Sequence, residues 1–367
     1  MIRTIYDIDT PAVLIEKSIM EDNIDSMQRL AERNGVNLRV HIKTHKIPEL
    51  AKLQLKAGAV GIAVAKLGEA EMMAEAGIND IQIANIITGS IKIRRLLRLH
   101  RKNRLTVGID SFDNARELAL AFEKAHRTLD VLIMINTGLN RCGLENDREV
   151  LKLADFCAGL KGIRLAGLMT HAGHAYASSS KVEIKKIGQY EGKRLADLAD
   201  ILQRRGHSIK IVSVGSTPTA KYCSAIKGVT ELRVGNYIFN DVTQVTLQTI
   251  SVRQCAASII STMISKSSVG RVIIDAGSKA LALDRGAHGS DAITGFGRII
   301  GGGGIISRLS EEHGIIDKAT RKFRIGDRIR IIPNHICTAM NLFDYAYLVD
   351  RERVLKKLRI TSRGKMN

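Results

Sequence analysis

Three segments of the chain combine residue types that could do chemistry. The first is HIKTHK, residues 41 to 46, where Lys43 ends an apolar run with the pattern of a buried strand. Loss of solvation at such a strand end lowers the pKa of a lysine and frees its amine as a nucleophile. A strand-end lysine is also commonly a surface residue that keeps its ammonium in water. This segment alone leaves both interpretations open.

The second segment consists of two turns, VGSTPTA at residues 214 to 220 and RVGNY at residues 233 to 237. A Gly-Ser-Thr turn leading into a helix offers backbone N–H groups and hydroxyls to a phosphate. Either turn alone is ordinary. They follow the seventh and eighth predicted strands, where barrels usually hold a phosphate, so together they favour a phosphate site.

The third segment is PNHIC, residues 333 to 337, in which His335 and Cys337 alternate with Ile336. On an extended strand both side chains would face the same side. Imidazole and thiolate suit Zn²⁺ and leave two positions for water or substrate. An H-x-C pair also occurs in protein cores, so the spacing alone does not establish a metal site.

A regular framework must position these segments. From about residue 37, short β-branched runs alternate with helical periodicity, which is typical of repeated βα units and a parallel sheet. Amphipathic stretches such as IPELAKLQLKAG and GEAEMMAEAG end at glycines that can terminate helices. Eight such units fit a closed (β/α)₈ barrel better than an open sheet, and no GxGxxG follows the first strand. The expected strands are residues 37 to 43, 61 to 65, 81 to 85, 104 to 110, 129 to 136, 163 to 170, 209 to 215 and 231 to 235.

After about residue 250 the helical periodicity fades, and strand-like segments separated by glycines and charges take over. We therefore expect a barrel over residues 18 to 250 and a β-rich domain over residues 251 to 367. The opening strand, within residues 1 to 17, could join either domain. The strand-like segments of the second domain are VTLQTISVRQCAASIIST, GRVIIDAGSKA, GDRIRIIPNHIC and YAYLVD.

Composition excludes several classes of protein. The net charge of +19 raises the question of nucleic-acid binding, but the basic residues are spread along the chain, aromatics are only 4%, and tryptophan is absent. We therefore expect no nucleic-acid partner and attribute the charge to a solvated surface that suits anionic substrates. No apolar signal region or membrane-spanning window is present, and five scattered cysteines do not suggest a disulfide framework. We expect a cytoplasmic protein without a membrane partner.

Ten motifs in this order resemble the fold-type III pyridoxal 5′-phosphate (PLP) enzymes, the alanine-racemase-like barrels. More specifically, they resemble the metal-activated branch of D-threonine aldolases and D-serine dehydratases. The resemblance covers nearly the whole chain and implies an α/β fold, with a PLP-binding (β/α)₈ TIM barrel followed by a smaller, mostly β C-terminal domain. The motifs are DTPAVLIE, HIKTHK, KLGEAE, NTGLNRCG, GLMTHAGHAY, VGSTPTA, ELRVGNYIFND, DAGSKALALDRG, EEHG and PNHICTAMNL.

The resemblance also implies a role for each site residue. Lys43 would be the Schiff-base lysine and proton shuttle, and Arg141 would approach the PLP phenolic oxygen or the substrate carboxylate. His171 would lie under the cofactor ring, unless it is simply a core histidine. His335 and Cys337 would bind the metal, for which the thiolate favours Zn²⁺ over Mn²⁺. The phosphate would be held by Gly215, Ser216, Thr217, Asn236 and Tyr237.

The implied activity is that of a PLP- and metal-dependent lyase acting on D-3-hydroxy amino acids. PLP is an electron sink for a carbanion, and a metal on the β-hydroxyl would assist either loss of hydroxide or retro-aldol cleavage. The H-x-C pair and the H-x-G-x-x-Y segment from His171 to Tyr176 favour a dehydratase over an aldolase. Two competing functions are an amino-acid racemase, whose usual tyrosine motif is not recognisable here, and a non-catalytic PLP-binding protein, which usually lacks a β-domain.

Barrels of this kind pair head to tail, so the resemblance also implies a homodimer. In that case Asp275 or Asp284 would contribute across the interface. The same segment could equally be an ordinary strand followed by a turn.

Overall fold

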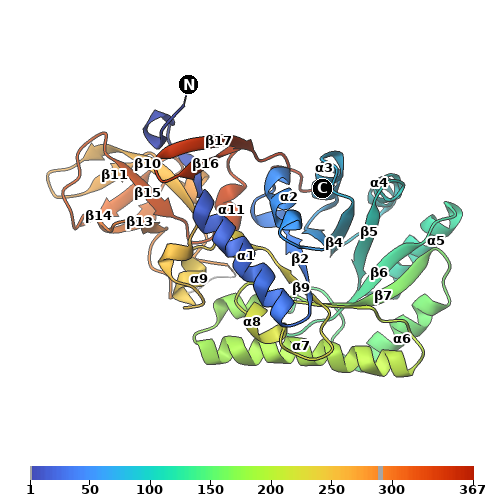
Figure 1. The fold of residues 1–367 in the computed structure, drawn as a ribbon. Helices are drawn as coiled ribbons and strands as arrows, with labels where there is room; N and C mark the ends of the chain where they lie inside the picture. Colours follow the sequence, from blue (N-terminus) through green and yellow to red (C-terminus); the bar gives the residue numbers. More distant parts are fainter. Residues whose placement is uncertain (1, 288–291) are drawn as a thin grey trace.

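The protein, described by a computed structural model over residues 2–287 and 292–367, contains a closed barrel of parallel strands (Figure 1). Each barrel strand falls on one of the predicted runs, with ends that differ by a few residues, so the predicted barrel is confirmed. The strands are β2 Asn37–His41, β3 Gly61–Val64, β4 Asp80–Ile86, β5 Arg104–Ile109, β6 Leu129–Met134, β7 Ile163–Met169, β8 Ile211–Val214 and β9 Glu231–Val234.

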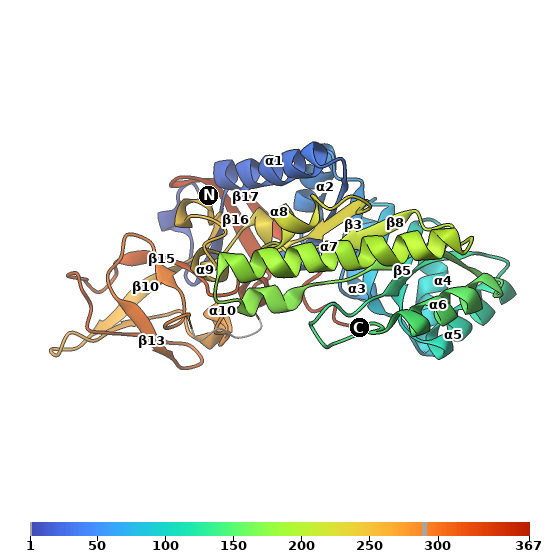
Figure 2. The same cartoon turned by 90° about the horizontal axis from the view of Figure 1, so that it is seen from below.

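Helices cover the outside of the barrel, and the outward-facing residues of the strands pack against them in the largest apolar cluster of the protein. The two predicted amphipathic helices are present and are followed by Gly58 and Gly77, which both have positive φ. Figure 2 shows the long α7 running along one side of the barrel. The helices are α1 Lys17–Arg33, α2 Pro48–Lys56, α3 Leu67–Glu75, α4 Ser90–His100, α5 Phe112–Lys124, α6 Asp147–Ala158, α7 Lys181–Arg204 and α8 Ala220–Cys223. No helix in the described part of the chain is long and apolar enough to cross a membrane.

The remaining strands form a second sheet beside the barrel, ordered β13-β14-β11-β10-β1-β16-β17, with β15 joining β10 to β12. The opening strand β1 pairs antiparallel with β10 and parallel with β16. It therefore belongs to this sheet and not to the barrel. The strands are β1 Ala12–Glu16, β10 Ala257–Lys266, β11 Val272–Ile274, β12 Arg298–Ile299, β13 Ile305–Leu309, β14 Gly314–Asp317, β15 Arg328–Ile332, β16 Tyr345–Asp350 and β17 Arg353–Arg359.

Two strand predictions in this half of the chain hold over only part of their length. The segment from residue 245 begins in a short helix, α9 Val242–Thr246, and continues through a 3-10 turn before β10 starts at Ala257. The segment containing His335 leaves β15 at Ile332 and enters another short helix, α11 Ile336–Met340. Asp241 explains both departures, because its carboxylate caps α9 through Gln244 N at 3.2 Å and also accepts from Ile336 N at 3.1 Å.

Candidate active site

A cavity of about 320 Å³ opens at the C-terminal ends of the barrel strands and is closed on one side by α11. Its lining joins side chains from the barrel to side chains at the start of α11. Among the predicted site residues, those that line it are Lys43, Arg141, His171, Ser216, Thr217, Asn236, His335 and Cys337. Gly215 and Tyr237 lie just behind this lining.

Lys43 lies in a single 3-10 turn, Ile42–Thr44, directly after β2, and not on the strand itself. The imidazole of His41 accepts from Lys43 N at 3.4 Å, which helps to close the turn. Burial lowers the pKa of Lys43, and the charge of Arg141 lowers it further, although the facing Cys337 acts in the opposite direction. The amine is therefore more readily deprotonated than that of a free lysine.

The two predicted phosphate turns are joined to each other, because Tyr237 N donates to Thr217 Oγ1 at 3.2 Å. Gly215 has φ +119°, and a Cβ there would lie 2.8 Å from Leu232 Cδ1, so the turn requires glycine. The Tyr237 side chain points away from the cavity and accepts from Gln54 Nε2 at 2.8 Å. Only the backbone of Tyr237 is available on the phosphate side.

A buried carboxyl group supports the first turn from behind. Glu191, in the middle of α7, accepts from the Thr219 hydroxyl and from Gly215 N at 3.3 Å. Burial raises the pKa of Glu191 to about 7. This residue was not predicted from the sequence, although its spacing from Ile184 and Leu195 places it on the apolar face of α7 and could have indicated its burial.

His171 follows β7 and lines the cavity, with its Nδ1 atom 3.2 Å from Gly215 O. Burial lowers the pKa of His171 well below its usual range, and the nearby charge of Lys43 lowers it further. The ring is therefore neutral and fixed to the phosphate turn. His171 therefore lines the cavity and is not a core histidine remote from the site.

His335 and Cys337 lie close together at the start of α11, although they do not lie on a strand. Burial lowers the pKa of His335, but the facing Cys337 outweighs this effect and raises it to about 9. Burial alone would raise the pKa of Cys337, but His335 lowers it. The pair is therefore stabilised as imidazolium and thiolate, and on deprotonation of the imidazole it offers one nitrogen and one sulfur ligand.

These residues fit a divalent metal as a partial ligand set. Nitrogen and sulfur donors suit a borderline-soft ion such as Zn²⁺. Among the described residues no group of three or more His, Cys, Asp or Glu side chains could hold a metal ion. The pair would therefore leave coordination positions for water or substrate.

The cavity also fits a phosphorylated, anionic cofactor. Its volume is at the lower end of the range for small-molecule sites. Gly235 leaves no room for a side chain, because a Cβ there would lie 2.6 Å from His41 O. Among the described lining residues, Lys43, Lys66, Arg141 and Arg233 carry positive charge, whereas none is Asp or Glu. Such a cavity attracts anions.

Several cavity residues were not predicted from the sequence, notably His41, Lys66 and Arg233. For Arg233 a signal was available. In the segment ELRV, Glu231 and Arg233 alternate along one barrel strand, so both face the barrel interior. Two inward-facing charges in a barrel indicate a polar network.

The two candidate interface carboxylates have different surroundings. Asp275 accepts from Ser261 Oγ at 2.7 Å and from Thr262 N at 2.9 Å, and it also accepts from Thr10. Its carboxylate is thus used within its own sheet. The charge of Asp284 raises the pKa of His335, which places it near the cavity of its own chain.

Comparison with protein families identifies two regions. Residues 15–242 match the alanine racemase N-terminal domain, and residues 256–349 match the serine dehydratase domain. The chain is 33% identical to the D-threo-3-hydroxyaspartate dehydratase of a Delftia species, over 91% of this chain and 92% of that protein. It is 30% identical to the D-threonine aldolase of an Arthrobacter species, over 97% and 93% of the two chains.

Solved structures are similar over the same extent. The D-threonine aldolase of Filomicrobium marinum superposes with a TM-score of 0.93 at 29% identity, covering 100% of this chain and 99% of that one. The Delftia D-threo-3-hydroxyaspartate dehydratase superposes with a TM-score of 0.91 at 30% identity, covering 97% and 98%. A mutant of a D-threo-3-hydroxyaspartate dehydratase is described in a metal-free form, with a TM-score of 0.91, 30% identity and coverage of 97% and 98%.

Proposed function

The chain belongs to the family that joins an alanine racemase N-terminal domain to a serine dehydratase domain, and on this premise we propose that it is a PLP- and metal-dependent lyase of D-3-hydroxy amino acids. One observation carries the proposal. A single cavity brings Lys43 of the barrel together with the His335–Cys337 pair at the start of α11. The first residue suits a carbonyl cofactor and the pair suits a metal.

The residues that would hold PLP are Lys43 at one end of the cavity and the turns after β8 and β9 at the other. Gly215, Ser216, Thr217 and Asn236 supply polar groups for the phosphate, and Tyr237 contributes its backbone. When bound, PLP withdraws electrons from the Cα atom of an amino acid. The lowered pKa of Lys43 equips its amine both to attach the cofactor and to move the proton at Cα.

The remaining cavity residues bind and orient. Arg141, on the loop after β6, is exposed at the cavity edge and carries the charge needed for a substrate carboxylate or the PLP phenolic oxygen. His171 is fixed and neutral, so it provides a flat surface for an aromatic ring without competing for protons. His335 and Cys337 would hold Zn²⁺, with Mn²⁺ as a second candidate, where a Lewis acid can bind a β-hydroxyl.

Dehydration is the reaction we favour, with aldol cleavage as the second candidate. The H-x-C pair and the His171 to Tyr176 segment support a dehydratase, whereas the similarity to D-threonine aldolases supports cleavage. The two relatives described above, at 33% and 30% identity, are named as a dehydratase and an aldolase, which gives no support to a racemase or a non-catalytic protein.

The charge of the cavity favours a substrate with a second carboxylate. Besides Lys43, which would be used by the cofactor, three cationic side chains line it, and no described lining residue is Asp or Glu. Such a cavity would attract a substrate with two carboxylates more strongly than a substrate with one. We therefore propose D-3-hydroxyaspartate ahead of D-serine and D-threonine, in line with the name of the Delftia relative.

An absorbance spectrum of the purified protein and a three-substrate assay test this proposal. We expect a visible band from lysine-bound PLP and an EDTA-sensitive release of oxaloacetate, pyruvate or 2-oxobutanoate. Glycine together with an aldehyde would establish the aldolase. If no PLP band forms even after cofactor is added, the proposal is overturned.

We also propose that the protein is a cytoplasmic homodimer. The five cysteines are free, which supports a reducing compartment. The dimer rests on analogy with related barrels. Light scattering of the purified protein would measure its mass, and a monomer at assay concentration would contradict the dimer.

A further inference from the structure

Two buried arginines face each other where the barrel closes. Arg39 of β2 and Arg233 of β9 are register partners on neighbouring parallel strands, and both are nearly inaccessible to solvent. Like charges in adjacent positions of a sheet destabilise it unless an opposite charge lies between them. Glu231, two residues before Arg233, supplies that charge on the same face of β9.

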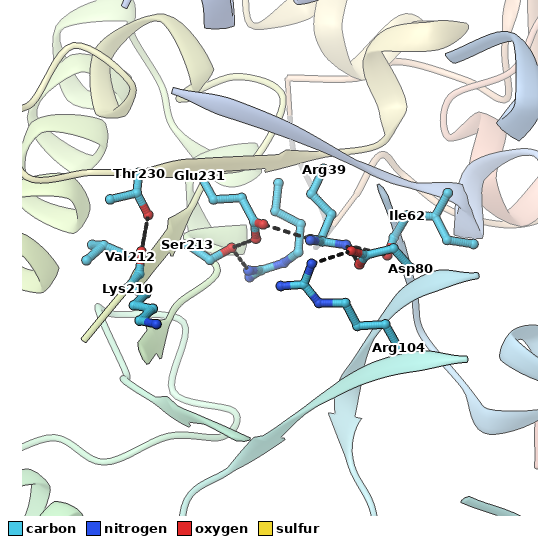
Figure 3. Close-up of polar contacts among 10 residues, drawn as sticks. Arg39, Ile62, Asp80, Arg104, Lys210, Val212, Ser213, Thr230 and Glu231 are labelled. Carbon is cyan, nitrogen blue, oxygen red and sulfur yellow. Dashed lines mark hydrogen bonds and ion pairs between the residues drawn. The ribbon is translucent and has the colours of Figure 1, made fainter. Parts of the chain in front are cut away.

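The side chains form a continuous chain of hydrogen bonds, most of which Figure 3 shows. Arg39 Nε donates to Glu231 Oε2 at 2.7 Å. Ser213 Oγ donates to Glu231 Oε1 at 2.7 Å and accepts from Arg233 Nη1 at 2.6 Å. We call Arg39, Glu231, Ser213 and Arg233 the barrel relay. Along the barrel relay, the positive Arg39 is followed by the negative Glu231. The neutral hydroxyl of Ser213 then separates Glu231 from the positive Arg233.

The lower end of the barrel relay is anchored near the solvent. Arg39 Nη1 pairs with Asp80 at 2.6 Å, and the partly exposed Asp80 also meets Arg104 at 3.4 Å. Gly61 makes room for this pair, because a Cβ there would lie 2.3 Å from Arg39 Nη1. The anchor is thus built into the backbone of β3 and fixes Arg39 in one orientation.

The upper end of the barrel relay reaches the cavity. Arg233 lines the cavity, and its Nη2 atom donates to Thr170 O. Its hydrogen-bond acceptors in the described part of the chain are the neutral Ser213 hydroxyl and this carbonyl oxygen. Its charge is balanced only at a distance, by Glu231 and Glu191, so it is available to a group bound in the cavity.

We propose that Arg39, Glu231 and Ser213 are positioning residues that hold the charged Arg233 guanidinium at the cavity floor, where it sets the affinity and electronic state of the bound cofactor. This inference rests on the proposed function. Without the Ser213 hydroxyl, Arg233 loses a hydrogen-bond acceptor and its only short connection to Glu231 among the described residues. The guanidinium would then no longer be held in one orientation.

Ser213→Ala tests the proposal, with Thr230→Ala as the matched control. Thr230 also carries a hydroxyl beside β8, but it contacts Val212 N at 2.8 Å and Lys210 O at 3.4 Å and has no part in the barrel relay (Figure 3). We expect Ser213→Ala to shift the visible absorbance maximum and to weaken PLP binding about tenfold, as expected for a lost hydrogen bond to a charged group. Thr230→Ala should leave both unchanged, and Ser213→Thr should restore both.

Stability is followed by thermal unfolding of both alanine variants, and Glu231→Gln serves as a second variant if Ser213→Ala does not fold. A Ser213→Ala or Glu231→Gln protein with the wild-type spectrum and PLP affinity would overturn the proposal. A wild-type protein that forms no PLP band would instead overturn the proposed function itself, so the two failures are distinguishable.

Discussion

Thr44 Oγ1 lies 3.2 Å from Cys337 Sγ, although 293 residues separate them in the sequence. Thr44 follows Lys43 in the same turn, and Cys337 belongs to the helix that closes the cavity. A second link lies beside it, because Lys46 pairs with Glu69 at 3.2 Å and donates to Asn341 at 2.8 Å. These contacts fix the distance between the lysine turn of the barrel and the candidate metal pair at the start of α11.

Replacing the cavity lysine should remove cofactor attachment. We expect Lys43→Ala to lose the visible PLP band and to lower lyase activity about a thousandfold or more, since the nucleophilic amine is gone. Lys66→Ala is the matched control, because Lys66 lines the same cavity. Loss of the band in Lys66→Ala with retention in Lys43→Ala would place the cofactor on Lys66. The measurement is an absorbance spectrum with added PLP.

Removing the thiolate should weaken metal binding without releasing the cofactor. We expect Cys337→Ala to lower the bound Zn²⁺ content and to make the activity of the protein insensitive to EDTA at a low residual level. Cys142→Ala is the control, because Cys142 is a second cysteine that lines the same cavity but is not part of the His335–Cys337 pair. Elemental analysis by mass spectrometry measures the metal. Equal metal content in both variants would contradict a role for Cys337.

A side chain at Gly215 should disturb the phosphate turn. Gly215→Ala places a Cβ 2.8 Å from Leu232 Cδ1 at φ +119°, so we expect PLP affinity to fall about tenfold and stability by about 1–3 kcal/mol. Gly206→Ala is the control, since Gly206 also has positive φ but nothing within 4 Å of a Cβ. Titration with PLP and thermal unfolding measure the two effects. A similar loss of affinity in both variants would exclude a specific effect.

Glu191 should make stability depend on pH. Its pKa rises from 4.5 to about 7 on folding because of burial, so the folded state binds this proton more tightly than the unfolded state. Its contribution is fully present below pH 4.5 and is lost as the pH rises through about 7, a change of about 3 kcal/mol. Glu191→Gln should therefore gain stability relative to the wild type by this amount between about pH 4 and pH 8. Parallel denaturant titrations measure the difference, and a constant difference across this range would contradict it.

The buried ion pair of Lys46 with Glu69 of α3 should contribute to stability. Lys46→Met leaves Glu69, which is 1% exposed, without its charge partner, and we expect a loss of about 3–5 kcal/mol. Lys17→Met breaks an exposed pair with Glu21 and should cost less than about 1 kcal/mol. Urea denaturation compares the two variants. A cost of Lys46→Met no larger than that of Lys17→Met would show that the buried pair is not stabilising.

Sequence alone determined the barrel and most of its site, because both are local. Each strand is a short β-branched run, and an amphipathic helix follows it. Each of these patterns can be recognised within its own segment, because it reflects which residues of that segment are buried. Lys43, His171 and the turn from Gly215 to Thr217 each directly follow a strand. In a parallel barrel this position places them at one rim, whatever the details of packing.

Only the tertiary structure decided the remainder, because those features depend on contacts between distant segments. His335 and Cys337 were expected to meet on a strand, but they meet at a helix start that Asp241 caps from 95 positions away. Tyr237 is predicted to help hold the phosphate, and only the structure shows that Gln54 binds its hydroxyl, which leaves the backbone for that role. The pairing of Arg39 with Glu231 requires the barrel to close between its first and last strands. A buried polar group must have a hydrogen-bond partner, but the local sequence pattern does not predict which distant residue will be that partner.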